Sequence, residues 1–209
     1  MDDTERADAA PEVPVRSPDD HRGPWSEADY RALDDPGIEK ALGDGRVELI
    51  DGALVIGPGP TAEDEAAVER TRAALNDALP EGLCVVGPVA LRMGRDCVLV
   101  PDLVVMRTPA DDEADADATP DSGAVVDADD VLMIAEIVGP DHGAVERTFK
   151  PLVYARARLP YLLIVDRQTP FASASMVISG RYHEYARASG QDELELEEPF
   201  RLRLPLPDK

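Results

Sequence analysis

The sequence predicts a mixed α/β domain, in which a central β-sheet carries helices on its faces. Three observations support this fold class. A turn signal at Asp51-Gly52 lies between two short apolar runs, a helical pattern follows from Thr61, and several strand-like runs are then interrupted by one further helical pattern. At 209 residues the chain is long enough to bury a substantial core as one domain.

We expect the folded domain to span residues 25–190. Residues 1–24 are rich in Asp, Ala and Pro and lack periodicity, which is typical of a disordered acidic tail. Residues 191–209 are expected to form a C-terminal edge strand and tail. An acidic loop insertion at 108–130 interrupts the domain, and from 109 onward it holds nine acids and no bases. A solvated loop is the plain interpretation, and a DNA-mimicking or autoinhibitory lid is the alternative.

The first part of the domain has clear local signals. Ser26 is a suitable N-cap for a short helix that continues to Leu33. The apolar runs 46–50 and 53–56 flank Asp51-Gly52, a dipeptide typical of two-residue hairpin turns. A β-hairpin is therefore predicted here.

The next element is a long helix. Thr61 and Asp64 resemble a capping box in front of an apolar helical stripe, which continues to Leu79. Strands are then expected at 83–86, 89–93, 98–106, 131–138, 161–165, 175–178 and 182–185, with a further edge strand at 193–197.

A second helix is predicted between the strands at 131–138 and 161–165. Pro151 fits the first turn of a helix, so the helix should begin near Thr148. Helical spacing predicts one apolar face, formed by Val145, Phe149, Leu152 and Val153. A second face carries Arg147, Lys150, Tyr154 and Arg158.

Two apolar strands each carry a single acid. Asp102 lies in the run 98–106 and Glu136 in the run 131–138. A carboxylate in such a run is costly to bury unless it is paired or holds a cation. With Lys150 following, the pattern suggests a Mg²⁺ or Mn²⁺ site, with Asp102 and Glu136 as ligands, beside a catalytic ammonium. The alternative for Asp102 is an acid that caps a turn at a strand end.

These residues carry a resemblance to the PD-(D/E)xK nuclease superfamily, and more closely to its restriction-endonuclease-like Uma-two family. The resemblance covers roughly residues 25–190. The matching motifs are Glu48-Leu-Ile-Asp-Gly-Ala53, Pro101-Asp102, Glu136-Ile-Val-Gly-Pro140, Glu146 to Lys150 to Tyr154, and Tyr161-Leu-Leu-Ile-Val-Asp166. Five motifs in the expected order are more specific than any one of them.

The resemblance implies a restriction-endonuclease-like fold with a mixed central β-sheet flanked by helices. It also implies a catalytic set of Asp102, Glu136, Lys150 and Glu48, with Glu48 as a third carboxylate. By its alternation with Val47 and Leu49 alone, Glu48 could equally face solvent.

The sequence departs from the family pattern at four places. The superfamily lysine usually stands where this chain has Val138, and Lys150 matches the Uma-two position on the following helix. A histidine usual at the start of the long helix is replaced by Asp64 or Glu65. Gly139 replaces a serine, and Leu162-Leu163 replace an aromatic pair. His142 has no partner histidine at ligand spacing, so it is interpreted as a loop residue.

Composition limits the partners and the compartment. The formal net charge of −22 predicts weak attraction to nucleic acid, although much of the acidic excess lies in 1–20 and 109–130. No apolar run reaches transmembrane length, so no membrane partner is expected. Cys84 and Cys97 show no disulfide or zinc spacing and fit buried thiols in the cytoplasm. A homodimer is left open.

The favoured hypothesis is a metal-dependent hydrolase, an endonuclease-like phosphodiesterase that cleaves nucleic acid. One alternative is a non-catalytic regulatory or binding protein on a nuclease-like scaffold. Another is a metal-dependent enzyme that acts on a small substrate, since an acidic body does not need to hold a polymer.

Overall fold

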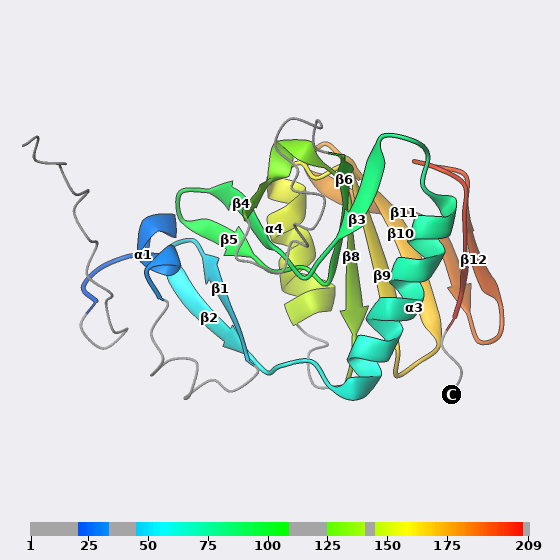
Figure 1. Ribbon diagram of the computed structural model, residues 1–209, viewed down its shortest axis with the longest axis horizontal. Helices are drawn as coiled ribbons and strands as arrows, with labels where there is room; N and C mark the ends of the chain where they lie inside the picture. The colour runs from blue at the N-terminus through cyan, green and yellow to red at the C-terminus, as the bar shows by residue number, and fades with distance from the viewer. Residues whose placement is uncertain (1–20, 34–44, 109–124, 141–144, 207–209) are drawn as a thin grey trace, which may run out of the picture.

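The computed structural model describes residues 21–33, 45–108, 125–140 and 145–206. It contains two sheets and a separate hairpin (Figure 1). The larger sheet has the strand order β11-β10-β9-β8-β6-β3, and the smaller one has the order β2-β1-β5-β4-β7. All pairings are antiparallel except β8 with β9 and β4 with β7, so the sheets are mixed as predicted.

The N-terminal elements form as their local signals predict. Helix α1 (Glu27–Arg31) starts at the N-cap Ser26, which exchanges capping hydrogen bonds with Asp29. Strands β1 (Arg46–Ile50) and β2 (Ala53–Gly57) pair as a hairpin. Both turn residues have positive φ, 50° at Asp51 and 77° at Gly52, as the tight turn requires.

Helix α3 (Ala62–Ala78) begins with a complete capping box between Thr61 and Asp64. Its apolar stripe packs on one face of the larger sheet, with Ala67, Val68 and Leu75 in the core (Figure 1). Strands β3 (Leu83–Val86) and β4 (Ala90–Gly94) follow, in different sheets.

The predicted strand 98–106 is wrong as a single strand. It is divided into β5 (Cys97–Leu99) in the smaller sheet and β6 (Leu103–Arg107) in the larger one. Pro101 has no N–H for a sheet ladder, and the segment from Val100 to Asp102 passes from one sheet to the other. This crossing places Asp102 between the two sheets.

The acidic insertion ends earlier than predicted. Residues 125–130 are regular structure, with β7 (Val125–Asp127) followed by the 3₁₀ turn η2 (Ala128–Asp130). Arg92 on β4 donates two hydrogen bonds to the Asp127 carboxylate, of 2.6 and 2.7 Å. Residues 109–124 lie outside the described part of the chain, as do residues 1–20 of the predicted tail.

Strand β8 (Val131–Val138) is the buried centre of the larger sheet. It is followed by a π-helical turn, η3 (Val145–Phe149), and by α4 (Lys150–Arg156), which has Pro151 in its first turn. Residues of β8 point alternately to two cores. Met133, Ala135 and Ile137 face α3, whereas Val131 and Ile134 face α4 and the smaller sheet.

The faces of α4 differ in part from the prediction. Phe149 and Leu152 are 44 % and 65 % exposed, whereas Lys150 and Tyr154 are buried. Of the predicted apolar face, only Val153 lies in the core. The ion pairs that bury Lys150 decide the orientation of the helix, and they are described with the candidate site.

The C-terminal half completes the larger sheet with β9 (Tyr161–Asp166), β10 (Phe171–Ile178) and β11 (Arg181–Ser189). A last hairpin, β12 (Glu193–Leu196) and β13 (Leu202–Pro205), packs beside α3 (Figure 1). Its leucines share the α3 core, so the segment expected to be an edge strand and tail is part of the core. No helix in the described part of the chain is long and apolar enough to cross a membrane.

Candidate active site

The four side chains that the sequence predicts as catalytic lie together at the junction of the two sheets. Glu48 lies on β1, Asp102 between β5 and β6, Glu136 on β8, and Lys150 at the start of α4. Leu103 pairs with Ala135 in antiparallel strands, which brings Asp102 beside Glu136. All four are buried.

Lys150 is the central cation of this cluster. Its Nζ lies 2.9 Å from Glu48 Oε1 and 3.5 Å from Glu136 Oε1, and only 2 % of the residue is exposed. Burial by itself would lower the pKa of Lys150, but the charges of Glu136 and Glu48 outweigh it and hold the pKa above its ordinary value. Lys150 is therefore a protonated ammonium at neutral pH and does not serve as a base.

Glu136 is fully buried. Its Oε1 accepts a hydrogen bond from the Tyr154 hydroxyl, and its buried Oε2 has no hydrogen-bond partner among the described residues. Burial raises the pKa of Glu136 to about 8, although the charge of Lys150 acts in the opposite direction. The carboxyl group thus carries a proton over most of the neutral range.

Asp102 is held by two donors from different elements. The Ile137 N–H donates to its Oδ2 at 2.7 Å, and Arg46 Nη1 donates to its Oδ1 at 2.6 Å. Burial opposes the charged form of Arg46, but the charge of Asp102 outweighs it and raises the pKa of the guanidinium. The interpretation of Asp102 as a simple turn cap does not describe these contacts.

Glu48 faces the cluster rather than solvent. Its Oε1 accepts a hydrogen bond from the Val100 N–H at 2.8 Å as well as the contact with Lys150. Val100 starts the crossing between the sheets, so this bond fixes the crossing segment to β1. Glu48 therefore positions both the ammonium of Lys150 and the loop that carries Asp102.

A pocket of about 190 Å³ opens onto the cluster. Arg46, Glu48, Asp102 and Lys150 line it, together with the apolar side chains Val55, Ile56 and Val145. Glu136 is fully buried and does not line the pocket. The pocket thus exposes two carboxylates and two cations of the cluster to a ligand.

A second ion pair stands at the edge of the same pocket. Asp64 lines the pocket, and its Oδ1 accepts a hydrogen bond from Arg167 Nε at 2.9 Å. A Cβ at Gly139 would lie 2.8 Å from this same Oδ1. Gly139, which stands where the family pattern has serine, therefore lies beside Asp64, one of the two acids at the place of the family histidine. The glycine leaves the space that the Asp64–Arg167 pair occupies.

Sequence reasoning did not identify Arg46 as a site residue. Arg46 is one arginine at the start of a strand, and only the fold brings it to Asp102. Tyr154 was part of the matching motif, but its bond to Glu136 could not be read from the spacing alone. His142 lies outside the described residues.

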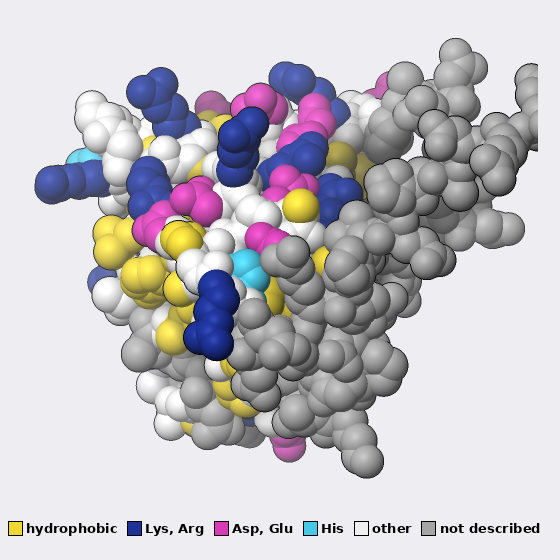
Figure 2. All heavy atoms as spheres, turned by 90° about the vertical axis from the view of Figure 1, so that its left-hand side faces the viewer, with side chains coloured by type: hydrophobic (Ala, Val, Ile, Leu, Met, Phe, Trp, Pro, Cys, Tyr) yellow, Lys and Arg dark blue, Asp and Glu magenta, His cyan; other side chains and the backbone are white. Residues whose placement is uncertain are grey.

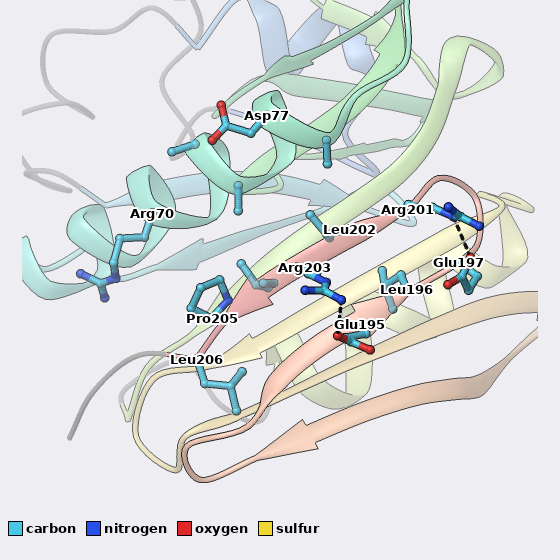
Figure 3. Close-up of a pocket in the computed structure, with 14 residues that line it drawn as sticks. Arg70, Asp77, Glu195, Leu196, Glu197, Arg201, Leu202, Arg203, Pro205 and Leu206 are labelled. Carbon is cyan, nitrogen blue, oxygen red and sulfur yellow. Dashed lines mark hydrogen bonds and ion pairs between the residues drawn. The ribbon is translucent and has the colours of Figure 1, made fainter.

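A larger hollow lies elsewhere on the described chain. Its volume is about 1110 Å³, and it lies between the C-terminal half of α3 and the β12–β13 hairpin (Figure 3). The charges on its rim are paired, Arg203 with Glu195 at 3.2 Å and Arg201 with Glu197 at 3.0 Å. It has none of the buried carboxylates of the cluster, so we place the candidate chemistry at the smaller pocket.

The donor atoms of the cluster suit a hard cation, but their arrangement does not form a ready metal site. Its donors are carboxylate oxygens, which suit Mg²⁺ or Mn²⁺, and Glu136 Oε2 is unpaired among the described residues. However, both oxygens of Asp102 are bonded to Arg46 and Ile137. Within the described ranges, no three Asp, Glu, His or Cys side chains converge as a preformed metal site.

Comparisons with known proteins identify the family and a similar fold. The family model Uma2 (Uma-two), described as "Putative restriction endonuclease", matches residues 28–207. A crystal structure titled as a putative nuclease belonging to DUF820, from Anabaena variabilis, is similar in fold, with a TM-score of 0.55 and 15 % identity. The match covers 73 % of this chain and 81 % of that one. No curated protein matches the chain.

Proposed function

The chain belongs to the Uma2 family, and from this membership we propose that it is a metal-dependent phosphodiesterase that cleaves nucleic acid in the cytoplasm. The family is restriction-endonuclease-like and the fold is nuclease-like. The observation that carries the proposal is the cluster of Asp102, Glu136, Glu48 and Lys150, of which Asp102, Glu48 and Lys150 line one pocket and Glu136 lies buried behind it.

Asp102 and Glu136 would hold Mg²⁺ or Mn²⁺. Such an ion lowers the pKa of bound water and neutralises charge on a phosphate. The unpaired Glu136 Oε2 supports this role, because a buried carboxylate oxygen without a donor is costly unless a cation or proton occupies it. Buried acids with raised pKa values are also typical of functional sites.

The other residues would act through charge and position. Lys150 lines the pocket as an ammonium and would stabilise the negative charge that develops on the phosphate oxygens. Glu48 also lines the pocket and would orient the attacking water, while its bond to Lys150 keeps the ammonium in place. Arginine would not replace Lys150 easily, because the position is almost fully buried between two carboxylates.

Substrate attraction must come from the pocket rather than from a basic surface. On the face of the molecule that carries α1 and the β1–β2 hairpin, acidic and basic side chains are interspersed over the described part (Figure 2). With a net charge of −22, the chain should bind polymer weakly and only at low salt.

The test is cleavage of single-stranded and duplex DNA and RNA with Mg²⁺ or Mn²⁺ at low salt. Asp102→Asn should abolish cleavage while the chain stays folded by circular dichroism. Asp127→Asn is the matched control, because it removes the same charge from an exposed pair with Arg92 and should leave cleavage unchanged. Equal cleavage by wild type and Asp102→Asn would contradict the proposal.

The small size of the pocket favours a second candidate, a metal-dependent enzyme acting on a small phosphoester. At about 190 Å³ it is smaller than usual ligand pockets and holds little more than a phosphate group. Hydrolysis of bis(p-nitrophenyl) phosphate without cleavage of any polymer would select this candidate. Metal binding without hydrolysis of either substrate would instead select the non-catalytic scaffold.

A further inference from the structure

Resting on the proposed metal site, we infer that Arg46 is an exchangeable counter-ion of Asp102, which must leave the carboxylate when a divalent cation binds. The guanidinium occupies Asp102 Oδ1 at 2.6 Å, and both residues line the pocket. The opposite oxygen is fixed by the Ile137 N–H at 2.7 Å. A cation that approaches Oδ1 therefore meets the positive charge of Arg46.

The two cations of the cluster differ in how firmly they are held. Lys150 is 2 % exposed and contacts two carboxylates, so removing it would leave both without a counter-charge. The Arg46 side chain is 23 % exposed, lines the pocket, and has Asp102 as its ion-pair partner. A long, partly solvated side chain can move into the solvent of the pocket while the incoming cation takes its place on the buried Asp102 carboxylate. Arg46 is thus the cation that moves.

The charges of the cluster support the same exchange. In the metal-bound state, in which all three are ionised, the carboxylates Glu48, Asp102 and Glu136 face two cations, Arg46 and Lys150. When Arg46 leaves, three carboxylates face Lys150 alone, and their excess of two negative charges matches one divalent cation. While Arg46 stays, the excess is one charge. Arg46 therefore lowers the affinity of the cluster for a divalent cation.

The experiment is calorimetric titration of the full chain with Mn²⁺ alone. Arg46→Met and Arg46→Gln should each bind Mn²⁺ about tenfold or more tightly than wild type, because the competing charge is gone. Arg46→Gln keeps an N–H donor for Asp102 Oδ1, so it remains informative if the methionine variant does not fold.

Arg92→Met is the matched control. It removes one guanidinium from a pair of the same length, 2.6 Å, with Asp127 on the smaller sheet. Its Mn²⁺ affinity should stay within about twofold of wild type, because the lost charge is screened by solvent. An equal gain in Arg92→Met would show a general charge effect and would overturn the inference.

The remaining outcomes separate this inference from the proposed function. Binding by wild type with equal or weaker binding by both Arg46 variants overturns the exchange alone. Absence of Mn²⁺ binding in wild type and in every variant overturns the metal site and the exchange together. A thermal shift with Mn²⁺ that is larger in the Arg46 variants than in wild type supports the exchange by an independent readout.

Discussion

Replacement of Lys150 by methionine should destabilise the protein strongly at neutral pH. Methionine keeps the length of the side chain but removes the charge that lies 2.9 Å from Glu48 and 3.5 Å from Glu136. Removal of one partner from a buried ion pair costs about 3–5 kcal/mol. Glu136 can escape part of this cost by keeping its proton, so we expect a loss of about 3 kcal/mol at pH 7.

Urea unfolding followed by circular dichroism measures this loss. With a slope of about 1–3 kcal/mol per molar urea, the midpoint should fall by roughly 1–3 M. The loss should shrink at pH 5, because without Lys150 the buried Glu136 carboxyl group takes up a proton more readily in the folded state. Sequence patterning would predict no loss, since it places Lys150 on the polar face of an amphipathic helix.

Arg203→Met provides the comparison. Arg203 pairs with Glu195 at 3.2 Å, but both side chains are largely exposed, and such pairs contribute about 0–1 kcal/mol. The double variant Lys150→Met/Glu136→Gln should recover part of the lost stability, because the buried carboxylate is gone. A Lys150→Met protein that unfolds at the same urea concentration as wild type at pH 7 would refute the reasoning.

Two further predictions concern the buried acid and the glycine beside the pocket. Glu136 has a folded-state pKa of about 8, above its unfolded value of 4.5, so its contribution to stability is present below pH 4.5 and is lost as pH rises to 8. Metal-free Glu136→Gln should therefore gain stability relative to wild type between pH 5 and 8 in urea titrations. If the free energies of unfolding of the two proteins changed in parallel with pH, burial would not govern the pKa of this carboxyl group. Gly139→Ala should lower stability by about 1–3 kcal/mol, because its Cβ would lie 2.8 Å from Asp64 Oδ1 and would push the carboxylate from Arg167. Gly57→Ala is the control, because nothing lies within 4 Å of the Cβ added there. Equal thermal midpoints for the two variants would contradict a close approach between the Cβ at position 139 and Asp64 Oδ1.

The parts of the fold that could be predicted are those with short-range causes. The Asp51-Gly52 turn needs two residues with positive φ, and the α3 capping box needs Thr61 and Asp64 three positions apart. Both conditions are visible in the sequence. The same holds for the lone acid in β8, because its burial follows from the apolar residues on either side of it.

The parts that could not be predicted depend on contacts between distant segments. Hydropathy predicted that Phe149 and Leu152 would face the core, but the ion pairs of Lys150 with Glu48 and Glu136 turn the helix the other way. The division of the run 98–106 depends on two sheets that the local pattern does not reveal. The site was predicted in its acids and lysine, whereas the role of Arg46 required the three-dimensional structure.

The crossing segment from Val100 to Asp102 has a consequence for how the protein opens. The Val100 N–H donates to Glu48 in one sheet and the Asp102 carboxylate accepts from the Ile137 N–H in the other, so the two sheets cannot separate without breaking one of these hydrogen bonds. The amides of β1 and of β8 should therefore exchange with solvent deuterium in one cooperative step, although the two strands belong to different sheets.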